Sequence, residues 1–196
     1  MCELLESREL LSTLVVSNTT DAAVPIPNSL RWAIDNVNAD STPDTIQFAI
    51  PGSGVQSIRL ISALPPIVNT VAIDGSSQPN YMGSPLIQLD GSTLGPGSDG
   101  LVISAGQSTV MGLAVVGFSG SAIVLNAPGG DVIEANYLGV TAAGGQASPN
   151  GTGITVSSSA SNTIGGPAGQ ANVISGNSGN GIVIQTGSKS ADGTFI

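Results

Sequence analysis

Short apolar segments with alternating middle positions recur along the second half of the chain. Four of them share a pattern in which two aliphatic residues flank one middle residue, usually directly after glycine. They begin 22, 31 and 28 residues apart, so the period varies. The segments are Gly100–Ile103, Ala122–Leu125, Gly153–Val156 and Gly181–Ile184. Alternation with a period of two over so few residues predicts short β-strands, and their recurrence is typical of repeat architectures.

A second set of strands follows the first at a constant distance. Nine residues after each of the first three segments begins, another apolar segment starts, and these contain Val110, Ile133 and Ile164. Strands this short do not form a stable hairpin sheet alone, and crossover helices have no room between them. We therefore predict an all-β fold in which the chain coils and each turn stacks on the next as a parallel ladder. The inward positions expected to stack along the axis are Leu101, Ile123, Ile154 and Ile182. The alternative is a β-sandwich, which predicts evenly spaced hairpin turns and not insertions of variable length at one corner.

The first half of the chain repeats less regularly and contains one segment of a different type. Residues 28–38 carry an apolar stripe at helical spacing, with Asn28 or Ser29 placed to cap its start. The stripe consists of Leu30, Ala33, Ile34 and Val37. Because the open end of a solenoid needs cover, we interpret this helix as an N-terminal cap and Trp32 as part of its packing. The strands predicted in this half are Thr45–Ile50, Ser57–Ile61, Thr70–Ile73 and Leu86–Leu89.

These elements suggest three regions. Residues 1–14 form an N-terminal leader, residues 15–43 the cap, and residues 44–196 about six to seven coils of roughly 23 residues each. The Gly- and Ala-rich segment 139–152 is the longest insertion and is expected to be a mobile loop. An uncapped, strand-like end is an aggregation liability, so we expect further coils of a longer protein after residue 196.

The composition removes several classes of site. The chain has no His and one Cys, Cys2, and its 13 Asp and Glu against four Lys and Arg give a net charge of −9. The lack of His excludes Ser-His-Asp and Cys-His catalysis and His-bound metals, and a single Cys excludes an intramolecular disulfide framework and a Cys-based zinc cluster. Four cations in an acidic chain offer nothing to attract nucleic acid. No apolar run reaches the length of a transmembrane helix, and the N-terminus does not have the pattern of an ordinary signal peptide.

Several motifs of the chain resemble those of a known family. The run Asn28-Ser-Leu-Arg-Trp-Ala-Ile, followed by Asp44-Thr-Ile-Gln-Phe, resembles the entrance of bacterial extracellular right-handed parallel β-helix proteins. The segments 70–75, 162–166 and 172–177 are similar to motifs of the same proteins. Residues 5–13 resemble a short N-terminal signature of planctomycete extracellular proteins. The resemblance implies a right-handed parallel β-helix with a short N-terminal capping helix, in a protein that is extracellular or on the cell surface.

Parallel β-helices include pectate lyases and polygalacturonases, so the resemblance raises the question of catalysis. The chain has neither the Gly-His-Gly nor the Arg-x-Lys of the polygalacturonase pattern, and Arg59 and Lys189 are the only basic residues of the predicted coils. The catalytic alternative that remains uses two carboxylates, Asp74 and Asp90, which lie 16 residues apart, each after a strand and before Gly. The competing interpretation is that both are turn residues. The same Asp-Gly pairs also offer ligands for Ca²⁺, but no dense acidic repeat supports such a site.

Other polar residues have a structural interpretation. Asn136 and Asn177 follow similar strands, and we expect them to belong to an internal Asn stack that bonds the corner backbone. Arg59, Glu134 and Lys189 are interpreted as solvated charges. The sequence therefore favours a non-catalytic extracellular or cell-surface module that needs no cofactor and serves structure, adhesion or weak contact with a polysaccharide or cell-surface glycan. Two alternatives stay open: a carbohydrate-active enzyme or enzyme remnant of the lyase or glycosidase type, and a truncated gene product without a function of its own.

Overall fold

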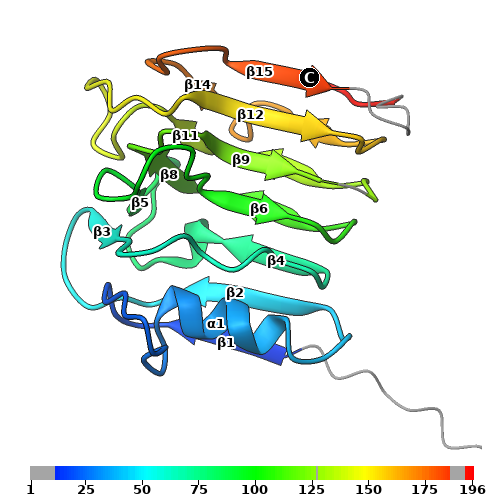
Figure 1. Cartoon of the computed structure of the whole chain (residues 1–196). Helices are drawn as coiled ribbons and strands as arrows, with labels where there is room; N and C mark the ends of the chain where they lie inside the picture. The colour runs from blue at the N-terminus through cyan, green and yellow to red at the C-terminus, as the bar shows by residue number, and fades with distance from the viewer. Residues whose placement is uncertain (1–11, 127, 186–192) are drawn as a thin grey trace, which may run out of the picture.

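The computed structural model describes residues 12–126, 128–185 and 193–196, so Cys2, Lys189 and most of the predicted leader lie outside the described residues. The described part contains fifteen β-strands, one α-helix and one short 3-10 helix. All pairings between these strands are parallel. The strands lie one above another, with β1 and β2 at one end and β15 at the other (Figure 1). The prediction of an all-β fold built from parallel strands is confirmed.

The strands form three sheets, which we name A, B and C. Sheet A contains β1 (Ser12–Val16), β2 (Asp44–Phe48), β4 (Val71–Asp74), β7 (Thr109–Met111), β10 (Val132–Glu134) and β13 (Thr163–Ile164). Sheet B contains β3 (Gln56–Arg59), β5 (Ile87–Asp90), β8 (Leu113–Val116), β11 (Tyr137–Leu138) and β14 (Val173–Ile174). Sheet C contains β6 (Leu101–Ile103), β9 (Ser121–Leu125), β12 (Thr152–Ser157) and β15 (Ile182–Gln185). From β4 onward, consecutive strands belong to sheets A, B and C in strict rotation, so every three consecutive strands add one strand to each sheet.

Aliphatic side chains stack in register along the inside of each sheet. In sheet C, Leu101 pairs with Ile123, Ile123 with Ile154, and Ile154 with Ile182, as the repeat predicted. In sheet A, Ile133 pairs with both Val110 and Ile164, which confirms the second set of strands. All of these residues except Ile182, in the last strand, are buried. The stacks give a continuous core from small aliphatic groups, which explains how the chain manages with 3% aromatic residues.

The strands of the first half lie within one to two residues of their predicted positions. The largest differences are at the C-terminal ends of the first two strands, predicted to reach Ile50 and Ile61, because β2 ends at Phe48 and β3 at Arg59. The backbone N–H and carbonyl of Ile50 bond instead to the buried side chain of Gln78, so this residue leaves the ladder. Three strands were not predicted: β8 and β11 in sheet B, and β1, which pairs with β2 over five residues, so sheet A begins in the segment assigned to the leader and the cap.

The single helix of the described residues, α1 (Leu30–Val37), begins and ends inside the predicted range 28–38. Ser29 is its N-cap and accepts a hydrogen bond from the Trp32 backbone N–H, whereas Asn28 lies outside the helix with φ 62°. The predicted apolar face is buried, and Trp32 packs partly buried against the core. The helix lies alongside β1 and β2 (Figure 1).

The longest insertion, which leads from β11 to β12, folds back on sheet B. Val140 and Ala147 form an antiparallel bridge, and the Ala142 N–H donates to the side chain of Gln88 on β5. Ala142 is buried. The mobility expected for this segment stays a prediction.

Candidate functional site

The two carboxylates of the catalytic alternative do not stack on one another. Asp74 ends β4 in sheet A, in register with Gln47 and Met111. Asp90 ends β5 in sheet B, in register with Arg59 and Val116. The two side chains therefore belong to different sheets and do not lie above one another.

Each of the two carboxylates stabilises the turn that directly follows it in the chain. Asp74 Oδ1 accepts a hydrogen bond of 2.9 Å from the Ser76 N–H, and Asp90 Oδ1 accepts one of the same length from the Ser92 N–H. This is the geometry of an Asx turn, two residues beyond the acid. Burial alone would raise the pKa of Asp90, but the hydrogen bonds from Ser92 and Arg59 outweigh it and hold the pKa below its usual value. The interpretation of both residues as turn formers is confirmed.

Arg59 is not simply a solvated charge. Its Nε lies 3.1 Å from Asp90 Oδ2, across the parallel pair β3–β5, while its side chain stays 65% exposed. An ion pair this exposed contributes little to stability. Glu134 is half-buried, and its nearest polar partner is Gln170, at 3.4 Å.

Asparagines bond the backbone at the corners, as expected for Asn136 and Asn177, but they belong to two separate ladders. At the corner between sheets A and B, Asn136 accepts from the Leu113 N–H and donates to the Val110 carbonyl of the preceding coil. The next coil places Asn172 above it, where Asn172 accepts from the Asn136 N–H and donates to the Ile133 carbonyl. The asparagine side chains thus take the place of backbone hydrogen-bond partners where the strands end.

The second ladder lies at the corner between sheets B and C. Asn150 is fully buried, accepts from the Phe118 N–H at 3.0 Å and donates to the Val115 carbonyl at 2.9 Å. Asn177 repeats the arrangement one coil later, accepting from the Asn150 N–H and donating to the Leu138 carbonyl. Buried backbone groups need such partners, so these amides are structural and are not ligands for a substrate.

Asp131 occupies the equivalent place at the corner between sheets C and A. Its Oδ1 accepts from the Ser108 N–H at 2.9 Å, and its own N–H donates to Asn162 Oδ1 in the next coil. The side chain is fully buried, and Oδ2 has no hydrogen-bond partner. Burial raises the pKa of Asp131 from 3.8 to about 6, against the hydrogen bond from Ser108. In the sequence, the only sign of this role is that Asp131 and Asn162 stand at equivalent positions ahead of equivalent strands.

A buried ion pair ties α1 to the loops that surround it. Arg31 Nε lies 2.7 Å from Asp21 Oδ1, Nη2 lies 2.9 Å from Oδ2, and both side chains are buried. Arg31 also donates to the carbonyls of Ser62 and Ala63, and Asp21 accepts from the Ile61 N–H. Burial would raise the pKa of Asp21, but the Arg31 hydrogen bond and the backbone donors lower it below its usual value.

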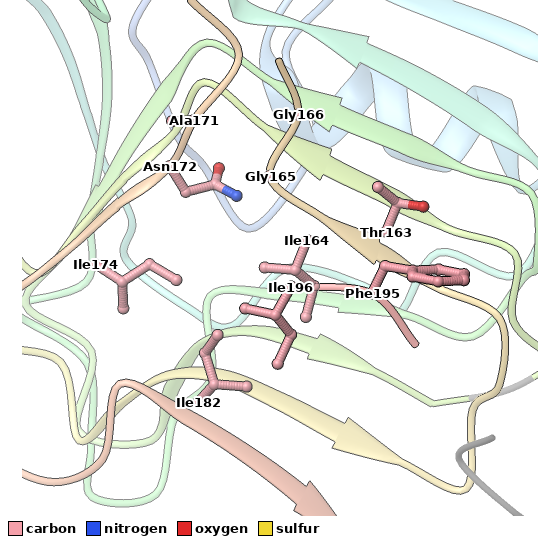
Figure 2. Close-up of a pocket in the computed structure, with 10 residues that line it drawn as sticks. All are labelled: Thr163, Ile164, Gly165, Gly166, Ala171, Asn172, Ile174, Ile182, Phe195 and Ile196. Atoms are coloured by element: carbon pink, nitrogen blue, oxygen red, sulfur yellow. The ribbon is translucent and has the colours of Figure 1, made fainter. Parts of the chain in front are cut away.

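A hollow of about 440 Å³ lies at the end of the described stack, beyond β13, β14 and β15. The side chains of Ile164, Ile174, Ile182 and Ile196 gather around it (Figure 2). Its polar lining consists of Thr163, Asn172 and backbone groups, without a titratable side chain among the described residues. The hollow therefore offers aliphatic contact and no acid–base chemistry.

Among the described residues, no three His, Cys, Asp or Glu side chains lie together in a way that could hold a metal ion. The one helix in this part of the chain is far too short to cross a membrane. Comparison with known proteins finds no family model that matches the chain and no curated protein that is similar to it.

Proposed function

We propose that the chain is a non-catalytic module of an extracellular or cell-surface protein, folded as a right-handed parallel β-helix. The strict rotation of strands through three parallel sheets supports the helical path. The in-register aliphatic stacks support a solenoid, because each coil buries its apolar face only against its neighbours. The motifs that resemble bacterial extracellular β-helix proteins support the location.

The use of the aspartates carries the non-catalytic part of the proposal. Seven aspartates of the described residues each accept a hydrogen bond from the chain's own backbone or side chains: Asp21, Asp40, Asp44, Asp74, Asp90, Asp99 and Asp131. Hydrolysis by two carboxylates needs a pair that faces one substrate and is free to exchange protons. Asp74 and Asp90 lie in different sheets and hold turns, so the enzyme alternative loses its best candidates.

Turnover assays test this proposal directly. The chain is incubated with neutral and acidic polysaccharides, and the release of reducing ends and of unsaturated uronides is followed. We expect no activity above that of heat-denatured protein. Turnover that disappears in both Asp74→Asn and Asp90→Asn, while Asp40→Asn keeps it, would establish the enzyme alternative, because Asp40 is an exposed aspartate that serves as the matched control.

The fold and the location have tests of their own. A far-UV circular dichroism spectrum dominated by helix would overturn the β-helix. Labelling of intact producing cells with a membrane-impermeant reagent is expected to reach the protein, and protection from the reagent until lysis would overturn the surface location.

A further inference from the structure

The chain contains only two tyrosines, and the fold brings Tyr137 to the loop that carries Tyr81, where its hydroxyl meets Ser84. Tyr137 starts β11 with its side chain directed outward, and Tyr81 lies in the loop between the 3-10 helix Gly75–Ser77 and β5. Burial, followed by the nearby Tyr137 phenol and the Asp74 charge, raises the pKa of Tyr81 above its usual value. Three groups that are 7 and 56 residues apart in sequence are thus neighbours on the surface.

The ring of Tyr137 extends along sheet B. Ala114 and then Gln88 are its in-register neighbours on the two preceding coils. Its hydroxyl lies 3.4 Å from the hydroxyl of Ser84, which is in the coil of Gln88, so the ring reaches across the small side chain of Ala114. Ala114 is fully buried, whereas Tyr137 is half-exposed. One part of the ring is therefore supported by the sheet while another part meets solvent.

Hydrogen bonds within the loop and to the backbone of Ile50 hold the loop that carries Tyr81 in place. The Tyr81 N–H donates to the Gln78 carbonyl, and the buried Gln78 side chain makes two hydrogen bonds to the backbone of Ile50. Ser76 and Asp74 close the start of the same loop. The backbone that carries the Tyr81 ring is therefore ordered before a ligand binds, which lowers the entropic cost of binding.

Two carboxylates lie at the ends of sheet A strands, where the chain passes on to sheet B. Asp74 and Glu134 point outward on sheet A, and Met111 lies between them in register with both. Successive parallel strands are about 4.8 Å apart, so the two carboxylates start from backbone positions about 10 Å apart. We name the set Tyr81, Tyr137, Asp74, Met111 and Glu134 the tyrosine face.

We propose that the tyrosine face binds a neutral polysaccharide by stacking sugar rings on Tyr81 and Tyr137 while Asp74 and Glu134 accept hydrogen bonds from sugar hydroxyls. The inference rests on the extracellular module proposed above and deepens it by naming a ligand class and a site. A pyranose ring has an apolar face of C–H groups and a rim of hydroxyl donors. Half-exposed phenol rings can stack on the apolar face of the sugar ring. Carboxylates, which accept strong hydrogen bonds, can bind its hydroxyl groups.

Electrostatics decide between neutral and acidic chains. A polyuronate would bring its carboxylates towards Asp74 and Glu134 on a protein whose net charge is −9. Arg59, an exposed cation of sheet B, already pairs with Asp90. The tyrosine face therefore rejects acidic polymers, and weak, non-covalent contact with neutral chains remains.

Fluorine NMR tests the site, because biosynthetic 3-fluorotyrosine introduces only two signals, one for each tyrosine. The protein is titrated with cellohexaose, mannohexaose and xylohexaose, and separately with hexagalacturonate. We expect both signals to shift in a saturable way with at least one neutral oligosaccharide and to stay unchanged with the acidic one. If neither signal shifts with any neutral oligosaccharide, or if hexagalacturonate binds equally well, the proposal is wrong.

Variants separate stacking from general surface effects. Electrophoresis through gels containing the matching neutral polymer measures the retardation of each variant. Tyr137→Ala and Tyr81→Ala are expected to weaken binding up to about tenfold each, whereas Tyr137→Phe keeps most of it. Phe195→Ala is the matched control, since Phe195 is an exposed aromatic residue at the far end of the stack. Equal retardation of wild type, Tyr137→Ala and Tyr81→Ala would overturn the site, and a native circular dichroism spectrum for all variants would leave the proposed scaffold intact.

Discussion

Replacement of Asp131 by Asn is the sharpest test of how the corners stabilise this fold. The carboxyl group is fully buried, one oxygen has no partner, and burial raises its pKa from 3.8 to about 6. A raised carboxyl pKa in the folded state means that folding favours the protonated acid. The Asp131 carboxyl therefore does not lower the free energy of unfolding below pH 3.8. Its destabilising effect grows as the pH rises through the window from 3.8 to about 6.

The magnitude follows from the shift. A difference of roughly two pKa units corresponds to about 3 kcal/mol when the penalty is complete, and about 2 kcal/mol of that develops between pH 4 and pH 7.5. Asn has the same shape, keeps the acceptor for the Ser108 N–H and has no charge to bury. The free energy of unfolding of Asp131→Asn, compared with wild type, is therefore expected to rise by about 2 kcal/mol between these two pH values.

Urea unfolding at pH 4, 5, 6 and 7.5, followed by circular dichroism, measures this difference. Asp90→Asn is the matched control with the opposite sign, because the pKa of Asp90 is lowered in the fold and its stabilising effect is lost on acidification. A difference between Asp131→Asn and wild type that does not change with pH would refute the reasoning. So would a variant that is progressively less stable than wild type as the pH rises.

Three further substitutions probe other parts of the structure. Arg31→Ala leaves the buried Asp21 carboxylate without its cation and is expected to cost about 3 kcal/mol in urea unfolding, and the loss becomes smaller as the pH falls through the lowered pKa of Asp21. Asn150→Ala removes the partners of one buried N–H and one buried carbonyl and is expected to cost about 2 kcal/mol, whereas Asn180→Ala, at an exposed site, leaves the melting temperature unchanged. Gly129→Ala combines a φ of +104° with a Cβ that meets the neighbouring coil's backbone, so we expect a loss of about 2 kcal/mol or more in the same assay.

The stacked strands could be predicted from the sequence because their signal is local. Alternating aliphatic residues such as those around Ile123 and Ile154 identify a strand, and the shared pattern identifies its neighbour in the next coil. The helix was equally accessible, since Ser29 and the apolar stripe after it are contiguous. β1 was missed because five residues with little alternation resemble a leader until β2 pairs with them.

The corner ladders and the surface site could be predicted less well, for a geometric reason. Insertions of different length separate the rungs of a ladder, so Asn136 and Asn177 resemble one another in sequence but occupy different corners. Tyr81 and Tyr137 are 56 residues apart, and the coil repeat brings them together only when the loop that carries Tyr81 is placed on sheet B. By contrast, the turn propensity of the Asp-Gly pairs alone was sufficient to predict that Asp74 and Asp90 form turns.

The residues that stabilise the fold and the residues proposed to bind saccharide lie in different places, so substitutions can separate the two properties. Buried aliphatic stacks and corner amides such as the fully buried Asn150 stabilise the packed sheets from within, away from the outer surface of sheet B. Tyr81 and Tyr137 lie on that surface and are only half-buried. Substitutions at the corners should therefore lower the free energy of unfolding without changing saccharide binding at temperatures where the variant is folded. Substitutions of the tyrosines should do the reverse, and a correlation between the two properties across both sets would show that the outer surface depends on the core packing after all.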